Sequence, residues 1–216
     1  MGKESPNTTP SSDDQLDEVE ILELKLNKAR IPRKYIHSTW GNFDFDSDRL
    51  LESETGTKLV QRLERFEDWR GDEPDGTLVF LTGRPGCGKT HLACATIHRW
   101  VMARRPGALF IVVGELLTEL RRGFDKGTSY GDMRQARDAK LLVLDDLGSE
   151  MATEWVRDTM YMMINYRLNH MKPTIVTSNL RLGEIAETYH SRLASRLAGE
   201  IAIDMNLLGD HRLVKP

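Results

Sequence analysis

The residue types and spacing that hold nucleotide phosphates occur in one segment, Gly83-Arg84-Pro85-Gly86-Cys87-Gly88-Lys89-Thr90, which fits the pattern G-x-x-x-x-G-K-[ST]. The glycines let the backbone curl so that its N–H groups converge on phosphate oxygens, and the start of the following helix adds partial positive charge. Lys89 is expected to face the β- and γ-phosphates, and the Thr90 hydroxyl to bind Mg²⁺. His91 follows directly and is expected to pack near the nucleotide. The segment predicts an ATP and Mg²⁺ site over residues 83–91.

Three further polar side chains follow two later apolar runs. Asp145 and Asp146 come directly after residues 141–144, and Asn179 follows residues 174–178. At the ends of neighbouring parallel strands these side chains would meet the phosphates. We expect Asp145 to hold the Mg²⁺ shell, Asp146 to orient or activate the attacking water, and Asn179 to hold that water against the γ-phosphate.

Two arginines, Arg192 and Arg196, lie four residues apart and share one face of a predicted helix over residues 191–197. Either one can be an ordinary solvated or ion-paired side chain. In an oligomeric ATPase, one of them can instead reach a neighbouring subunit's γ-phosphate as an arginine finger, because a planar guanidinium stabilises spreading negative charge.

A stretch of basic and aromatic residues is a candidate for binding single-stranded DNA, where cations neutralise the backbone and rings stack on bases. Its members are Arg121, Arg122, Phe124, Lys126 and Tyr130. The alternative interpretation is a solvated loop.

The composition restricts the class of protein. The chain has 216 residues, 39% of them apolar, and a formal net charge of −3, so we expect a domain of ordinary size without a uniformly basic surface. Its two cysteines support neither a disulfide framework nor a zinc site. No segment has the length and apolarity of a membrane-spanning helix or a signal peptide, which predicts a cytoplasmic protein without a membrane partner.

Strands and helices alternate in the second part of the chain. Short apolar runs predict strands over residues 77–82, 108–113, 141–144, 174–177 and 201–203. Helical periodicity predicts helices over residues 90–102, 115–122, 153–171, 182–188 and 191–197. This order predicts an α/β fold, a parallel sheet flanked by helices, with the site at the carboxyl ends of the strands.

The chain before the sheet divides into several segments. Residues 1–13 are polar and acidic and predict a disordered tail, residues 14–31 predict an amphipathic helix, and residues 32–216 the main domain. An aromatic-bearing loop over residues 33–47 and a helix over residues 50–69 are expected at the start of that domain. The amphipathic helix carries an apolar stripe, formed by Leu16, Val19, Leu22 and Leu26. It either packs on its own domain or serves as a partner-binding handle.

The motifs together resemble a known family. The runs GRPGCGKTHLA, LLVLDDLGSE, PTIVTSNL and SRLASRL are similar to those of DnaC/DnaI-type helicase loaders and of the related IstB-type transposition ATPases, both of the AAA+ class. The similarity covers roughly Arg30 to Arg212. It implies that Asp145 and Asp146 form the Walker B pair, that Asn179 is sensor I and that Arg196 is the finger. Arg212 falls where a sensor II-like arginine would sit.

The resemblance also implies a function. It predicts an ATPase that forms homo-oligomers on single-stranded DNA and loads a replicative helicase. One alternative is an IstB-like helper of a transposase, and a second is an ATP-switched DNA-binding module with negligible turnover. Many AAA+ proteins have Asp-Glu where this chain has Asp145-Asp146, and the shorter Asp146 is compatible with slow hydrolysis.

Overall fold

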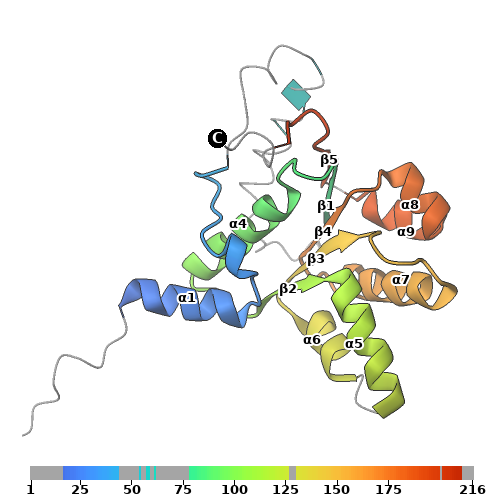
Figure 1. The fold of residues 1–216 in the computed structure, drawn as a ribbon, viewed down its shortest axis with the longest axis horizontal. Coiled ribbons are helices and arrows are strands. Elements are labelled where there is room, and N and C mark those ends of the chain that lie inside the picture. The colour runs from blue at the N-terminus through green and yellow to red at the C-terminus, as the bar shows by residue number, and fades with distance from the viewer. Residues whose placement is uncertain are drawn as a thin grey trace, which may run out of the picture.

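The computed structural model describes residues 17–43, 54, 57–58, 61, 78–126, 130–199 and 201–210, with the side chains of residues 124–126 and 130 left out. A five-stranded sheet runs through the centre of this part of the chain, in the order β2-β3-β4-β1-β5 (Figure 1). Its strands are β1 (Leu78–Thr82), β2 (Ala108–Val112), β3 (Leu141–Leu147), β4 (Thr174–Ser178) and β5 (Ile201–Asp204). Every pairing is parallel, which confirms the predicted parallel sheet.

Helices cover both faces of the sheet (Figure 1). The helices on one face are α1 (Glu18–Lys28) and α4 (Lys89–Met102). A 3-10 turn, η1 (Arg33–Tyr35), follows α1 and leads into the rest of the domain. Those on the other face are α5 (Val113–Lys126), α6 (Tyr130–Asp138), α7 (Glu154–Asn169), α8 (Leu182–Thr188) and α9 (Ser191–Leu197). Within the described residues, none of these helices is long and apolar enough to cross a membrane.

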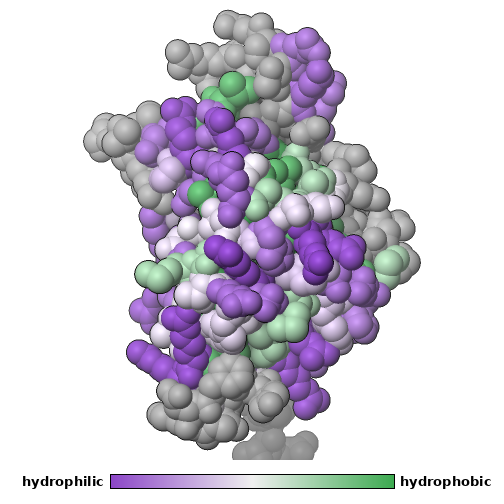
Figure 2. Space-filling model, turned by 90° about the vertical axis from the view of Figure 1, so that its right-hand side faces the viewer, coloured by the Kyte–Doolittle hydropathy of each residue, from purple (hydrophilic) through white to green (hydrophobic). Residues whose placement is uncertain are grey.

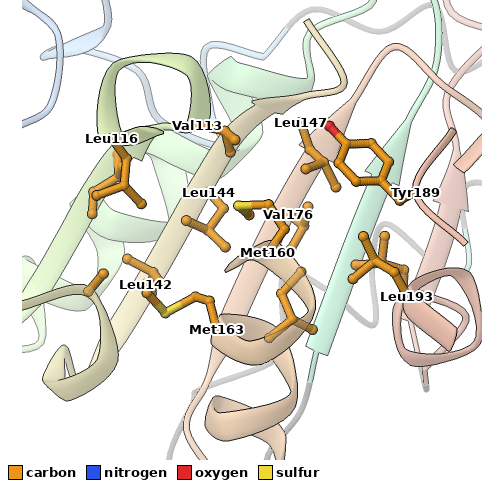
Figure 3. Packing of buried hydrophobic residues seen from close by; sticks show 14 of the residues in the cluster. Val113, Leu116, Leu142, Leu144, Leu147, Met160, Met163, Val176, Tyr189 and Leu193 are labelled. Carbon is orange, nitrogen blue, oxygen red and sulfur yellow. The ribbon is translucent and has the colours of Figure 1, made fainter. Parts of the chain in front are cut away.

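The strands are buried on both faces because successive side chains point to opposite sides. In β1, Val79 and Leu81 join the core under α4, whereas Phe80 joins the core under α7. Figure 3 shows this second core, in which Met160 and Met163 pack against side chains of the sheet. A central sheet with two cores fixes the carboxyl ends of its strands, where the predicted site residues lie.

Helix α1 belongs to the first core. Leu26 is 1% exposed and Leu22 is partly buried, both within the core cluster that contains α4. The following turn reaches the edge of the sheet, where the Phe110 N–H donates to the Ala29 carbonyl at 2.8 Å. The structure therefore shows this face of the helix packed on its own domain, while Val19 and Leu24 remain 63% and 55% exposed.

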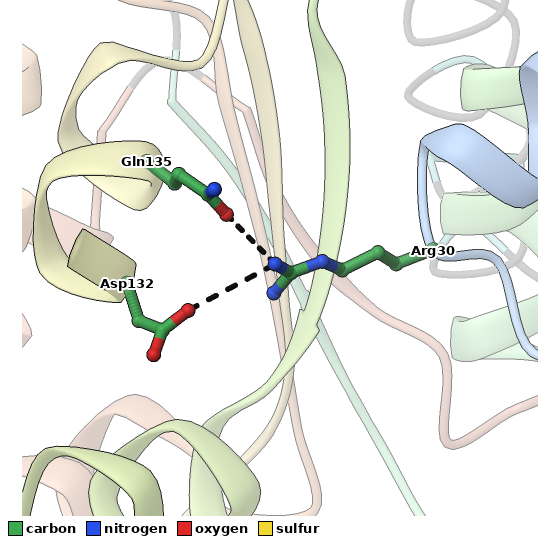
Figure 4. Close-up of polar contacts among 3 residues, drawn as sticks. All are labelled: Arg30, Asp132 and Gln135. Carbon is green, nitrogen blue, oxygen red and sulfur yellow. Dashed lines mark hydrogen bonds and ion pairs between the residues drawn. The ribbon is translucent and has the colours of Figure 1, made fainter. Parts of the chain in front are cut away.

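Arg30 fastens this segment to the other side of the sheet. Its guanidinium crosses the edge strand β2 and donates to Gln135 Oε1 at 2.7 Å, with Asp132 Oδ1 3.8 Å away (Figure 4). Both acceptors lie on α6. The Arg30 contact therefore joins the two helical layers across the edge of the sheet.

Two elements differ from the predictions. Strand β3 continues three residues past Leu144, through both aspartates. Helix α6 was not predicted, because its sequence is short and mostly polar, with only Met133 and Ala136, among its described side chains, as apolar contacts to the core. The predicted tail over residues 1–13 lies outside the described residues, and so does most of the predicted helix over residues 50–69, of which only positions 54, 57, 58 and 61 are described, as helical.

Candidate nucleotide-binding site

The loop over residues 83–88 connects β1 to α4, as the motif requires. Gly86 and Gly88 have φ angles of +87° and +92°, in the left-handed region that favours glycine. Each also has a close neighbour. A Cβ at Gly86 would lie 1.9 Å from the Asp210 carboxylate, and one at Gly88 would lie 2.3 Å from the Phe43 ring. The loop is therefore enclosed between the segment before the sheet and the segment after β5.

Lys89 points back into this loop. Its side chain is 7% exposed, and Nζ donates to the Gly83 carbonyl at 2.6 Å, the Arg84 carbonyl at 2.9 Å and Asn179 Oδ1 at 2.9 Å. These three acceptors are neutral, and among the described residues no carboxylate bonds directly to the ammonium, whose positive charge interacts with Asp145 at longer range. Such a charge attracts an anion, and a phosphate oxygen can replace any of these acceptors.

Asp145 lies below the loop and is held by two hydroxyl groups. Thr90 Oγ1 and Thr177 Oγ1 donate to its Oδ1 at 3.0 and 2.7 Å. Burial raises the pKa of Asp145, the two hydroxyl hydrogen bonds oppose that shift, and the neighbouring charge of Asp146 adds to it. A buried carboxylate beside a threonine hydroxyl is a set of hard oxygen donors, which suits Mg²⁺.

Asp146 is turned toward the next strand by an irregularity in β3. The register between β3 and β4 shifts between Leu144 and Leu147, and Asp146 has a φ of +60°. Its N–H donates to Thr177 Oγ1 at 2.9 Å, and its carboxylate accepts from Asn179 Nδ2 at 2.9 Å. Bulges of this kind redirect side chains near active sites, and this one lets both aspartates reach the site.

Asn179 joins the two halves of the site. Its amide accepts from Lys89 and donates to Asp146, so a continuous set of hydrogen bonds runs from the loop to the second aspartate. The contributing strands β1, β4 and β3 are neighbours in the sheet. The structure thus brings together the predicted residues Lys89, Thr90, Asp145, Asp146 and Asn179.

The remaining predicted residues of the loop have varied surroundings. Arg84 and Pro85 are exposed, and Arg84 binds Asn206 through its N–H and its guanidinium at 2.9 and 3.0 Å. The Cys87 side chain is buried beneath the loop, which raises its thiol pKa. His91 contacts the Thr39 carbonyl through Nε2 at 2.9 Å. The predicted Arg212 lies outside the described residues.

Arg192 and Arg196 lie on α9, which packs on the face of the sheet opposite α4. Both side chains are exposed, and neither has a hydrogen bond or an ion pair with any residue that the structure describes. The structure therefore does not bring them into the cluster around Lys89 within one subunit. The side of the molecule that carries α8 and α9 faces the viewer in Figure 2, where its surface is largely hydrophilic with scattered hydrophobic areas.

The basic-aromatic stretch is described only in part. Arg121 and Arg122 are exposed on α5, whereas the side chains of Phe124, Lys126 and Tyr130 lie outside the described residues. Arg121 lies 5.1 Å from the centre of the Trp155 ring, a cation–π contact that the sequence analysis missed. The tryptophan is distant in sequence, so no local pattern pairs it with the arginine.

Other contributors to the site were also missed. Thr177 could have been noticed as a polar residue near the end of an apolar strand. Phe43 and Asn206 could not, because they reach the loop from distant segments whose positions depend on the fold.

Comparisons with known proteins agree with this geometry. The family model described as "IstB-like ATP binding protein" matches residues 18–199. The replicative helicase loader DnaI of Bacillus subtilis is 28% identical over 82% of this chain and 56% of its own. A Mycobacterium tuberculosis insertion-sequence protein whose name gives it as ATP-binding is 34% identical over 73% of this chain and 58% of its own. The chain spans about half the length of the curated relatives it matches.

Solved structures show the same fold. The crystal structure of DnaI has a TM-score of 0.65 at 24% identity, covering 83% of this chain and 95% of that one. The initiator DnaA bound to AMPPCP and single-stranded DNA has a TM-score of 0.61 at 23% identity, covering 80% of this chain and 50% of that one. The fold is that of an AAA+ domain with a phosphate-binding loop. The chain belongs to the family of IstB-like ATP-binding proteins and is homologous to the DnaI and DnaC helicase loaders.

Proposed function

We propose that this protein is an ATPase that assembles on single-stranded DNA and loads a replicative helicase. The observation that carries the ATPase assignment is the joined cluster in which Asn179 binds both Lys89 and Asp146 while Thr90 binds Asp145. A loop that only bound phosphate would need neither Asn179 nor the second aspartate. This cluster adds groups able to position water beside a phosphate.

The residues divide the work of hydrolysis between them. Backbone N–H groups of the loop and the Lys89 ammonium bind the phosphates of ATP. Thr90 and Asp145 would hold Mg²⁺, which neutralises charge on the phosphate oxygens when bound. Asp146 orients the attacking water and accepts its proton, and Asn179 holds that water toward the γ-phosphate. Because Asp146 is one methylene shorter than glutamate, we expect slow turnover.

A second subunit completes the site in this proposal. Arg196 is exposed, has no partner among the described residues and lies on the sheet face opposite α4. An arginine so placed is available to a neighbouring molecule. Its guanidinium would stabilise the charge that spreads over the γ-phosphate in the transition state.

The DNA and helicase parts of the proposal rest on the relatives and on two surfaces. DnaI and DnaC are named as replicative helicase loaders, and the DnaA structure contains single-stranded DNA. Arg121, stacked on Trp155, and the exposed Arg122 supply cations beside an aromatic ring. The outward side of α1, with Ile21 and Leu24 exposed at 38% and 55%, supplies an apolar surface for the helicase.

A second candidate function is that of a transposase helper. It is favoured by the description of the matching family and by the insertion-sequence relative, whose identity of 34% exceeds the 28% of DnaI. The ATPase core serves either function. The two candidates differ in the protein that binds α1.

The test combines hydrolysis with partner binding. The wild-type protein should release phosphate from ATP faster when single-stranded DNA is added, and the Lys89→Ala variant should not hydrolyse ATP under either condition. In a pull-down, the replicative helicase from the same cell should be retained and the Leu24→Ser variant should retain less. Retention of a transposase from the same genome instead of the helicase would favour the second candidate, and DNA-independent hydrolysis at the same rate would contradict the DNA-assembly proposal.

A further inference from the structure

The joint between α8 and α9 is fastened to the loop that follows Asp146. This joint consists of Tyr189 and His190. Tyr189 is 1% exposed, and its hydroxyl donates to Glu150 Oε1. The other oxygen of the same carboxylate accepts from the Gly148 N–H at 3.2 Å. Gly148 lies two residues after Asp146, so a short path of covalent and hydrogen bonds connects the catalytic aspartate to the start of α9.

The joint itself has an unusual backbone. His190 has a φ of +150° and a ψ of 162°, a conformation that residues with side chains rarely adopt. Its ring packs edge-on against Tyr161 of α7, with 5.8 Å between ring centres. A residue persists in such a conformation only where its surroundings hold it there. The burial of Tyr189 and the ring contact of His190 with Tyr161 hold the chain in position at this point.

Helix α9 depends on this joint for its direction. It has only seven residues, too few to be stable without tertiary contacts. Leu193, Ala194 and Leu197 anchor its inner side in the core, and Arg192 and Arg196 project from its outer side. The inner contacts hold the helix on the sheet, and the Tyr189 hydroxyl adds a directional hydrogen bond two residues before the helix begins.

We propose that Tyr189 and Glu150 are positioning residues that fix α9 relative to the Asp146 loop and so aim Arg196 at the nucleotide of the neighbouring subunit. The inference rests on the proposed shared site. Burial and the Glu150 carboxylate raise the pKa of Tyr189, so its hydroxyl remains a donor at neutral pH. Among the described residues, neither Tyr189 nor Glu150 has a side-chain hydrogen bond to the cluster around Lys89 and Asp146, which separates this role from catalysis.

Mixed oligomers isolate the effect on the finger. A Lys89→Ala subunit supplies a finger without an active loop, and an Arg196→Ala subunit supplies a loop without a finger, so their mixture should regain hydrolysis on single-stranded DNA. Adding Tyr189→Phe to the finger-supplying subunit should lower that regained rate on the order of tenfold, because a small displacement of a reacting group is costly. Adding Tyr189→Phe to the loop-supplying subunit should leave the regained rate unchanged.

Two further variants test the hydrogen bond itself. Glu150→Gln keeps an oxygen acceptor for Tyr189 and, placed in the finger-supplying subunit, should retain most of the regained rate. Glu150→Ala should lower it as Tyr189→Phe does. Tyr166→Phe removes a tyrosine hydroxyl from α7, away from the bond between Tyr189 and Glu150. It is the matched control and is expected to have no effect.

The outcomes separate this inference from the proposal beneath it. Equal loss from Tyr189→Phe in both kinds of subunit would show a general structural role and overturn the inference alone, as would loss in neither. A parent mixture that regains no activity, although both variants bind DNA, would overturn the shared site and the inference with it. An unchanged rate in the loop-supplying arm also shows that the Tyr189→Phe subunit is folded.

Discussion

Asn179 illustrates how single residues acquire a role through their neighbours. It accepts from Lys89 and donates to Asp146, so it contacts both the side chain that we propose binds phosphate and the one that we propose orients water. An incoming phosphate would compete for Lys89 and leave the Asn179 carboxamide free to bind water. The same residue can therefore hold the site together without nucleotide and take part in hydrolysis with it.

The two aspartates should respond differently to the same substitution. Asp146→Asn should keep ATP binding and lower the hydrolysis rate, because Asn179 can still bond to the new side chain but the proton acceptor is lost. Asp145→Asn should impair both Mg²⁺-dependent binding and hydrolysis. Nucleotide affinity and single-turnover phosphate release check this prediction, and equal loss of affinity in the two variants would show that the roles are wrongly assigned.

Lys89→Ala should abolish measurable ATP binding while the protein stays folded. The ammonium is the positive charge that the described structure turns into the loop, and the backbone N–H groups alone are a weaker anion site. Fluorescent-nucleotide titration and thermal unfolding measure the two quantities. Unaltered affinity would rule out the phosphate-loop assignment.

At this scale the sequence predicts the chemistry better than the geometry. The spacing of residues 83–90 and the aspartates after an apolar run are local patterns, and the structure brings those side chains together. The bulge at Asp146 and the hydroxyl of Thr177 are not local, since both depend on how β3 pairs with β4. Phe43 and Asp210 against the loop glycines depend on the whole fold.

At the scale of elements, α1 presents two different faces. The apolar stripe predicted from sequence treats its members as equivalent, but the structure buries Leu26 and exposes Val19. Exposed Ile21 and Leu24 were not in the predicted stripe. Periodicity identified the helix, yet it could not say which apolar side chains the domain covers, because that depends on the position of α4.

Leu24 and Leu26 form a matched pair for testing α1. Leu26→Ser should lower the free energy of unfolding by about 2–5 kcal/mol, as truncation of a buried leucine does. Leu24→Ser should change it by less than about 0.5 kcal/mol, since its side chain is exposed, and should weaken partner binding instead. Chemical denaturation and the pull-down measure the two effects. Strong destabilisation by Leu24→Ser would contradict the assignment of its face to a partner.

Helix α6 was missed from sequence because its apolar residues are few, and a buried arginine of α7 secures its end. Arg167 of α7 is fully buried, and burial lowers its pKa to about 9, so it stays charged at neutral pH. Its guanidinium donates to a ring of acceptors around the end of α6 and the start of β4, namely the carbonyls of Ala136, Arg137, Ala139 and Pro173 and the hydroxyl of Thr174.

Arg167→Met should destabilise the protein by about 3 kcal/mol or more, because it leaves several buried carbonyls without a donor. Hydrogen exchange should show the largest loss of protection in α6. Arg157→Met, at an exposed position of α7, is the control and should change stability by less than about 0.5 kcal/mol. A small effect of Arg167→Met would mean that apolar packing alone holds α6.

At the scale of the whole molecule, the sheet separates the phosphate loop from Arg196. The phosphate loop and α4 lie on one side, and α9 with Arg196 packs on the other. The alternation of strands and helices in the sequence was sufficient to predict this layered fold. It could not predict on which face α9 packs, and the proposed shared site depends on that position.

The most direct test of a shared ATPase site is the hydrolysis rate per subunit over a series of protein concentrations, with and without single-stranded DNA. For the wild-type protein this rate should rise with concentration and with DNA, because both bring Arg196 to a neighbouring nucleotide. Trans-acting arginines are worth on the order of 10³-fold where they have been measured, and the short Asp146 favours a smaller factor here.

Arg196→Ala should abolish the rise in rate and leave the nucleotide affinity of the single subunit unchanged. Arg192→Ala, one turn away and also exposed, should retain the rise in rate. A wild-type rate per subunit that does not vary with concentration or DNA, or an Arg196→Ala variant that shows the full rise, would contradict the shared site.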